Sequence, residues 1–211
     1  MKNIITSVVI VFLSIRIGFS QGFVNLDFEQ ANLSGYGSGS VPATNAFPGW
    51  SVIASYLLYD DTSLSGGSIS IMDVAGIAGP LIQRKYFVFF RNASSLSVSI
   101  GQTGQIPSSA QSIIYWGQTP LPGDPVGIQV TFNAQPLDFV ETGSTANYNI
   151  YQANISAFAG QSGELLFTAP PNGIGSLDNI QFSSSPVPEP SELALAALGT
   201  LLLGSRRWKS R

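Results

Sequence analysis

The chain has 211 residues, no cysteine and no histidine, only 10% charged residues, and a formal net charge of −3. Without these two residue types it has no disulfide, no thiolate metal site, no cysteine nucleophile and no histidine general base. A chain of this length suits one domain with a hydrophobic core.

The first 20 residues have the layout of a secretory signal peptide. Lys2 precedes an apolar run from Ile4 to Leu13, and small residues stand at Gly18 and Ser20. This order predicts an N-terminal signal-peptide helix that is cleaved after Ser20. Arg16 places a charge close to that site, so an uncleaved N-terminal anchor is the alternative.

Residues 21–185 are predicted to form the mature body of the protein. They contain three basic residues against ten acidic ones, which leaves a net charge of −7. Such a body repels the phosphates that dominate the affinity of nucleic-acid-binding proteins. Nucleic acid is therefore not expected as a partner.

Short apolar stretches alternate in this body with clusters of Gly, Ser, Pro, Asn and Asp, as strands alternate with turns. The strands are expected at residues 23–28, 50–58, 67–72, 86–90, 96–100, 112–116, 128–132, 147–155, 164–168 and 177–182. No long amphipathic helix pattern is present, so we predict an all-β fold, a β-sandwich or jelly roll.

Several local features refine this prediction. Residues 86–90 (YFVFF) and 112–116 (SIIYW) are apolar on both faces and are expected in covered central strands. A turn is expected at 121–125 (LPGDP), and one helical turn within 155–163, with Gly160 at its end. The acidic loop at 59–63 is interpreted as solvated.

A glycan site would need exposed aromatic rings surrounded by polar groups. The aromatic residues considered are Trp50, Tyr56, Tyr59, Tyr115 and Trp116, together with Tyr36 and Tyr86. Trp50 and Trp116 lie in apolar strand patterns and are expected to fill the core. Tyr36, Tyr59 and Tyr86 border polar or glycine-rich stretches and are the candidate glycan-binding residues.

No catalytic residue is assigned. A pair of carboxylates suffices for glycoside hydrolysis, but the ten acids of the body are scattered and single out no pair. A serine nucleophile without histidine would need a lysine base, and the body contains only Lys85. A non-catalytic protein is expected, with a glycan-active enzyme as the less favoured alternative.

The last 26 residues, 186–211, have three parts. Pro186, Pro188 and Pro190 keep the first part extended. The apolar segment from Leu193 to Gly204 would form a helix about 18 Å long, shorter than the ~30 Å hydrocarbon core. A basic cluster then ends the chain and would stay in the cytoplasm under the positive-inside rule.

This order of a Pro-Glu-Pro turn, a short apolar helix and an arginine cluster resembles the PEP-CTERM sorting tail. The resemblance implies a protein that is recognised by an exosortase and exported together with exopolysaccharide or biofilm material. It assigns recognition to Pro188, Glu189 and Pro190, and the membrane stop to Arg206 and Arg207. The apolar helix would anchor the chain in the membrane before processing. An ordinary C-terminal membrane anchor is the alternative interpretation.

The segments NLDFEQANLSG, FPGW and GSLDNIQF resemble elements of galactose-binding-like jelly-roll modules. They resemble still more closely the β-rich exported proteins with PEP-CTERM tails of the Verrucomicrobia and Planctomycetes group. The resemblance implies that the first and last strands pair and bring Glu29 near Asp178. Some members of the galactose-binding-like group hold a structural calcium there.

Calcium prefers six to eight oxygen ligands, which a chain without histidine can supply. Glu29 and Asp178 are the predicted ligands, with Asp27 or Asn179 as further candidates. In the alternative interpretation Glu29 caps a turn and Asp178 binds backbone amides. No cofactor other than this calcium is expected.

Taken together, these features predict an exported, non-catalytic protein of the cell surface or extracellular matrix. A carbohydrate-binding module with a defined glycan site is the second interpretation.

Overall fold

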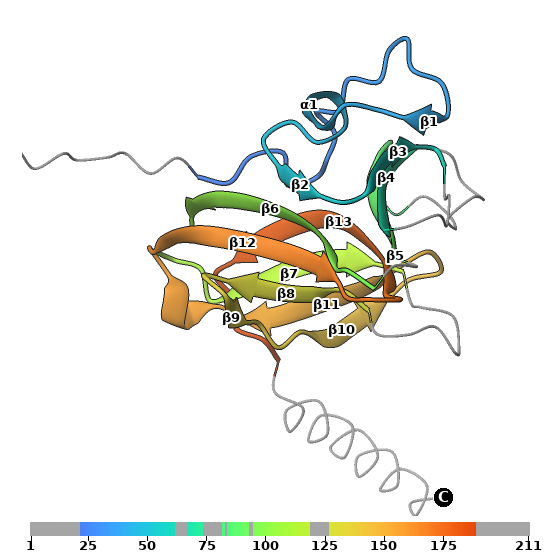
Figure 1. The fold of residues 1–211 in the computed structure, drawn as a ribbon. Helices are drawn as coiled ribbons and strands as arrows, with labels where there is room; N and C mark the ends of the chain where they lie inside the picture. Colours follow the sequence, from blue (N-terminus) through green and yellow to red (C-terminus); the bar gives the residue numbers. More distant parts are fainter. Residues whose placement is uncertain are drawn as a thin grey trace, which may run out of the picture.

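A computed structural model describes residues 22–61, 67–73, 82, 84–92, 95–118 and 127–188 of the chain. Within these residues nearly every regular element is a strand, and the strands form two sheets (Figure 1). The helical elements among them are one short helix, α1 (Ala43–Ala46), and one 3-10 turn, η1 (Ser156–Phe158). The prediction of an all-β fold is confirmed.

The larger sheet has eight described strands in the order β1-β3-β4-β5-β13-β7-β11-β10. Its strands are β1 (Gly39–Ser40), β3 (Tyr56–Tyr59), β4 (Gly67–Met72), β5 (Phe87–Asn92), β7 (Ser112–Gly117), β10 (Val140–Ser144), β11 (Asn149–Asn154) and β13 (Ile174–Ser183). Neighbours are antiparallel except β3 and β4, which run parallel.

The smaller sheet has five described strands in the order β2-β6-β12-β8-β9. Its strands are β2 (Ser51–Ile53), β6 (Val98–Gln105), β8 (Gln129–Phe132), β9 (Gln135–Pro136) and β12 (Ser162–Ala169). Figure 1 shows β6, β12 and β8 lying over β13, β7 and β11 of the larger sheet.

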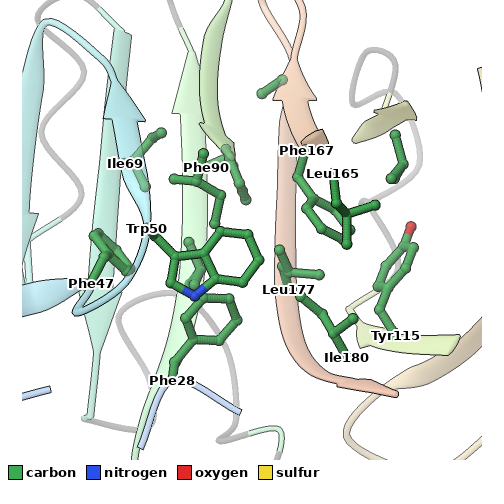
Figure 2. Close-up of a cluster of buried hydrophobic side chains, with 14 of the residues drawn as sticks. Phe28, Phe47, Trp50, Ile69, Phe90, Tyr115, Leu165, Phe167, Leu177 and Ile180 are labelled. Carbon is green, nitrogen blue, oxygen red and sulfur yellow. The ribbon is translucent and has the colours of Figure 1, made fainter. Parts of the chain in front are cut away.

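The main hydrophobic cluster is built by alternate residues of strands from both sheets. In β12 the buried positions are Leu165, Phe167 and Ala169, two residues apart, as a strand with one inner face requires. Leu177 of β13 and Phe90 of β5 belong to the same cluster from the other sheet (Figure 2). The two sheets are therefore joined by a shared core.

A second, smaller hydrophobic cluster explains why residues 86–90 and 112–116 are apolar on both faces. Met72, Ile82 and Phe87 form this cluster, with Phe89 and Trp116 packed against it. Both runs belong to internal strands, since β5 lies between β4 and β13 and β7 lies between β13 and β11. Their expected central position is confirmed.

The expected strand at 50–58 is two strands that belong to different sheets. β2 pairs with β6 in the smaller sheet, and β3 pairs with β4 in the larger one. Ala54 and Ser55 connect them, and the Ser55 backbone N–H donates to Gly67 O at 3.0 Å. The chain thus crosses between the sheets here, which a continuous apolar run does not reveal.

The expected strand at 23–28 is wrong, because this segment is a turn-rich connection. Asn25 and Phe28 have φ values of 50° and 56°, which are incompatible with an extended strand. Gln102 of β6 holds the segment, since its side chain accepts from Val24 N at 2.6 Å and donates to Val24 O at 3.0 Å. Ile180 N of β13 donates to Leu26 O at 2.9 Å.

Consequently the first and last strands do not pair as expected. The N-terminal segment contacts β13 through the Ile180–Leu26 hydrogen bond and through the rings of Phe23 and Phe182, and Gly22 forms an isolated parallel bridge with Gln105 of β6. The segment therefore touches both sheets without joining either as a strand.

Two local predictions have clear outcomes. The helical turn within 155–163 is confirmed as η1, and Gly160 follows it with φ of 77°, a left-handed conformation that glycine adopts without strain. Of the acidic loop at 59–63, residues 59–61 are described; they are half-buried, and Asp60 Oδ1 accepts from Asp73 N at 2.8 Å, so this part is less solvated than expected. The turn at 121–125 and the signal peptide at 1–20 lie outside the described residues.

Candidate functional site

A pocket of about 220 Å³ opens beside β7, β11 and the start of β13. It is smaller than the ~300–1,000 Å³ typical of sites for drug-sized ligands. The lining residues are Tyr115, Gln118, Gly127, Ile128, Phe139, Tyr151, Ile174, Gly175 and Ser176.

Three aromatic rings form one wall of this pocket. Tyr115 and Tyr151 are direct partners across β7 and β11, and their rings stack with centroids 5.0 Å apart and planes at 23°. Phe139 meets Tyr115 edge-on at 4.9 Å. Aromatic pairs in these arrangements add rigidity as well as buried area, so the wall is preorganised.

Tyr115 is 6% exposed, and Figure 2 shows its hydroxyl pointing away from Ile180. Burial raises the pKa of the Tyr115 phenol, and the neighbouring Tyr151 adds to the rise. The phenol therefore stays neutral at physiological pH and keeps its proton for hydrogen bonding.

Gln118 and Ser176 add polar groups to the lining of the pocket. Ser176 Oγ accepts a hydrogen bond from Gln118 N at 2.7 Å. A Cβ atom at Gly175 would lie only 2.7 Å from Ile128 Cγ1, so a larger residue there would force Ile128 to shift. The pocket therefore combines stacked aromatic rings with adjacent polar groups.

None of the predicted glycan-binding tyrosines lines this pocket. Tyr36 is 38% exposed and lies in the loop before β1. The Tyr59 hydroxyl donates to Asp73 Oδ2 at 2.8 Å, and burial together with this bond raises its pKa. Tyr86 is 5% exposed and belongs to the core, so the expectation that its ring is exposed is wrong.

The two tryptophans expected in the core differ in their placement. Trp50 is 7% exposed, packs on Phe28, and donates from Nε1 to Asn25 O at 3.0 Å (Figure 2). Trp116 is half-buried and stacks on Tyr148 with centroids 4.4 Å apart. The core position is therefore confirmed for Trp50, whereas Trp116 packs against the smaller cluster. Tyr56 is 45% exposed at the start of β3.

The predicted calcium ligands lie at the junction between the N-terminal turn and β13. Glu29 Oε1 accepts from Lys85 N at 2.9 Å and from Tyr86 N at 3.0 Å. Asp178 is 1% exposed, and its Oδ1 accepts from Asn179 N at 2.6 Å. Both carboxylates thus accept from backbone amides, as the alternative interpretation expects.

Whether calcium fits this junction depends on the oxygen atoms that its residues offer. Among the described residues no three acidic side chains cluster closely enough to hold a metal, so backbone oxygens would have to complete its shell. Asp27 is already bound to Arg84 at 2.8 Å. Asn179 Nδ2 is buried and meets no acceptor within the described part of the chain; since the two ends of an amide interchange by a flip, Asn179 can offer oxygen to a cation.

Of the predicted sorting motif, only Pro188 is described, and it is exposed. Glu189, Pro190, Arg206 and Arg207 lie outside the described residues, as does the expected C-terminal helix. Within the ranges that the structure describes, no helix has the length and apolar character needed to cross a membrane.

Comparisons with known proteins yield no further assignment: no family model matches this chain, and no curated protein and no solved structure matches it either.

Proposed function

We propose that this chain is an exported, non-catalytic β-sandwich protein of jelly-roll type, sorted by an exosortase through its PEP-CTERM tail to the cell surface or extracellular matrix. The two sheets that share one core support the sandwich assignment. Association with exopolysaccharide follows from the resemblance of the tail.

One observation carries the sorting proposal. After β13, residues 184–186 and Pro188 are exposed, and the Pro-Glu-Pro sequence begins at Pro188. A sorting enzyme must reach its motif, and an exposed, proline-rich exit from a folded body provides that access.

The proposal is tested by replacing Arg206 and Arg207 with serine in the producing cells. The variant should lose the positive stop at the membrane and accumulate as unprocessed precursor. Immunoblots of cell fractions and mass spectrometry of the C-terminal peptide measure this outcome.

The matched control replaces Arg84 and Lys85, an adjacent basic pair on the body whose side chains are both 61% exposed. This control should be processed normally. Normal processing of the Arg206→Ser, Arg207→Ser chain would contradict the sorting proposal.

Carbohydrate binding is the second candidate function, and the pocket beside Tyr115 and Tyr151 favours it. Tyr151→Ala removes one stacked ring and should weaken binding about fivefold, because aromatic contacts contribute ~1 kcal/mol beyond their area. Affinity electrophoresis of the full chain in gels containing polysaccharide from the producing cells measures the effect.

Tyr148→Ala is the matched control, since Tyr148 is also partly buried and stacked but lies outside the pocket. Equal retardation of wild type and both variants, or no retardation at all, would count against a glycan site in this pocket.

A further inference from the structure

The chain remains attached to the larger sheet for a few residues past the end of β13. Gln111 N donates to Ser183 O at 2.8 Å, which continues the pairing of β13 with the residues preceding β7. Ser185 N donates to the Ser183 hydroxyl at 3.0 Å, and the chain bends at residues 184–185.

Two buried side chains then hold the backbone of the next residues, and we call Ser112 and Gln152 the clasp. Ser112 Oγ donates to Ser185 O at 2.7 Å, and Gln152 Nε2 donates to Pro186 O at 3.4 Å. The clasp residues are 0% and 7% exposed. Ser185 and Pro186 are themselves exposed, so it is their carbonyl groups, not their side chains, that the body retains.

The clasp is also connected internally. Gln152 Nε2 donates to Ser112 Oγ at 2.8 Å, which orients the hydroxyl proton toward Ser185 O. Ser112 lies opposite Asn154 in the β7–β11 pairing, so Gln152, two residues from Asn154, projects from the same face. Ser112 and Gln152 therefore lie on one sheet face and together bind the backbone carbonyl groups that precede the tail.

The hydrogen bonds from the clasp end at Pro186. No hydrogen bond joins Val187 or Pro188 to another residue in the described part of the chain; Val187 is half-buried and Pro188 is exposed. An endopeptidase needs several consecutive residues in extended form with their backbone groups available, and it gains access to a bound segment only through local opening.

From this contrast we infer that the clasp sets the limit of proteolytic processing at the C-terminus. An endopeptidase that removes the tail hydrolyses a peptide bond at or beyond Pro186–Val187. Water adds to the carbonyl carbon, the C–N bond breaks, and the leaving nitrogen takes the proton. Bonds between Ser183 and Pro186 stay protected while the clasp is closed. In the cell this inference rests on the proposed function, because the tail is removed only if the chain is sorted.

The test digests the purified full chain in mild detergent with proteinase K and identifies the C-terminal residue of the protected body by mass spectrometry. The wild-type body should end at Pro186, Val187 or Pro188. In Ser112→Ala the body should be trimmed to Ser183–Ser185 about five- to tenfold faster, since the donor to Ser185 O is lost.

Ser99→Ala is the matched control, because Ser99 is likewise a strand serine, 7% exposed, whose hydroxyl bonds Thr168 at 2.9 Å in the smaller sheet. It should leave the C-terminal limit unchanged. Gln152→Met provides a second variant of similar shape that lacks the donor. The inference would be overturned if the wild-type body were shortened to Ser183–Ser185 as fast as the Ser112→Ala body. It would also be overturned if the C-terminal residue of the protected body were the same in both clasp variants as in the wild type.

Failure of the clasp and failure of the sorting proposal are distinguishable. The digestion uses no exosortase, so its outcome is independent of sorting. If the chain from the producing cells retains residues 189–211 while the digestion stops at Pro186–Pro188, the sorting proposal fails and the clasp stands.

Discussion

At the residue scale, Asn92 shows how one polar side chain can join three separate segments. It is 1% exposed at the end of β5, and its Nδ2 lies within 3.1 Å of three backbone carbonyls, those of Leu96, Ala169 and Pro170. Buried carbonyl groups that lose their donor cost free energy, because water cannot replace it.

Asn92→Ala should therefore lower the free energy of unfolding by about 2–3 kcal/mol. Urea unfolding followed by tryptophan fluorescence, to which the buried Trp50 contributes, measures the change. Asn147→Ala, at an exposed position between β10 and β11, should change it by less than ~0.5 kcal/mol. Equal effects of the two substitutions would show that Asn92 does not hold the three segments together.

At the scale of elements, the N-terminal turn depends on neighbours from both sheets. Gln102 of β6 binds both backbone groups of Val24, while Ile180 of β13 binds Leu26 and the backbone at Lys85 binds Glu29. The turn therefore connects the sheets at the place where the predicted calcium ligands lie. A cation there would strengthen this connection and stabilise the folded chain.

If calcium binds at this junction, removing it with a chelator should lower the melting temperature of the full chain. At a hundredfold excess over Kd, bound calcium contributes ~2.7 kcal/mol, or about 5–10 °C for a domain of this size. Differential scanning calorimetry with calcium and with chelator measures the shift.

Glu29→Gln is the informative companion, because glutamine retains an oxygen that can accept from Lys85 N and Tyr86 N but lacks the negative charge. This variant should melt as the chelated wild type does and respond little to calcium. If the wild type had the same melting temperature with calcium and with chelator, the result would contradict calcium binding at this junction.

At the scale of the whole molecule, β13 connects all the features described above. It pairs first with β5 and then with β7, with a shift in register between Asp178 and Gln181. Its first residues line the pocket, its middle carries Asp178, and its end leads into the clasp. Pocket, junction and tail exit are thus positioned by one strand.

Much of this architecture was predictable from local patterns. The two-sided apolar runs at 86–90 and 112–116 correctly identify β5 and β7 as internal strands, because a strand that is covered on both faces must be apolar on both. The short strands β1, β9 and β10 carry no comparable run, and they exist because a longer neighbour pairs with them. Residues 23–28 look like a strand, but tertiary hydrogen bonds bend them into a turn.

By itself the sequence determined the all-β class, the position of most strands, the chemistry excluded by the missing cysteine and histidine, and the expectation of a sorting tail. These properties depend on composition and on neighbours a few residues apart. Only the tertiary structure decided which residues meet: Tyr115 with Tyr151, Glu29 with the backbone at Lys85, and Ser112 with Ser185. The reason is that strand order and register are set by packing between segments distant in the chain, which leaves no local pattern to read.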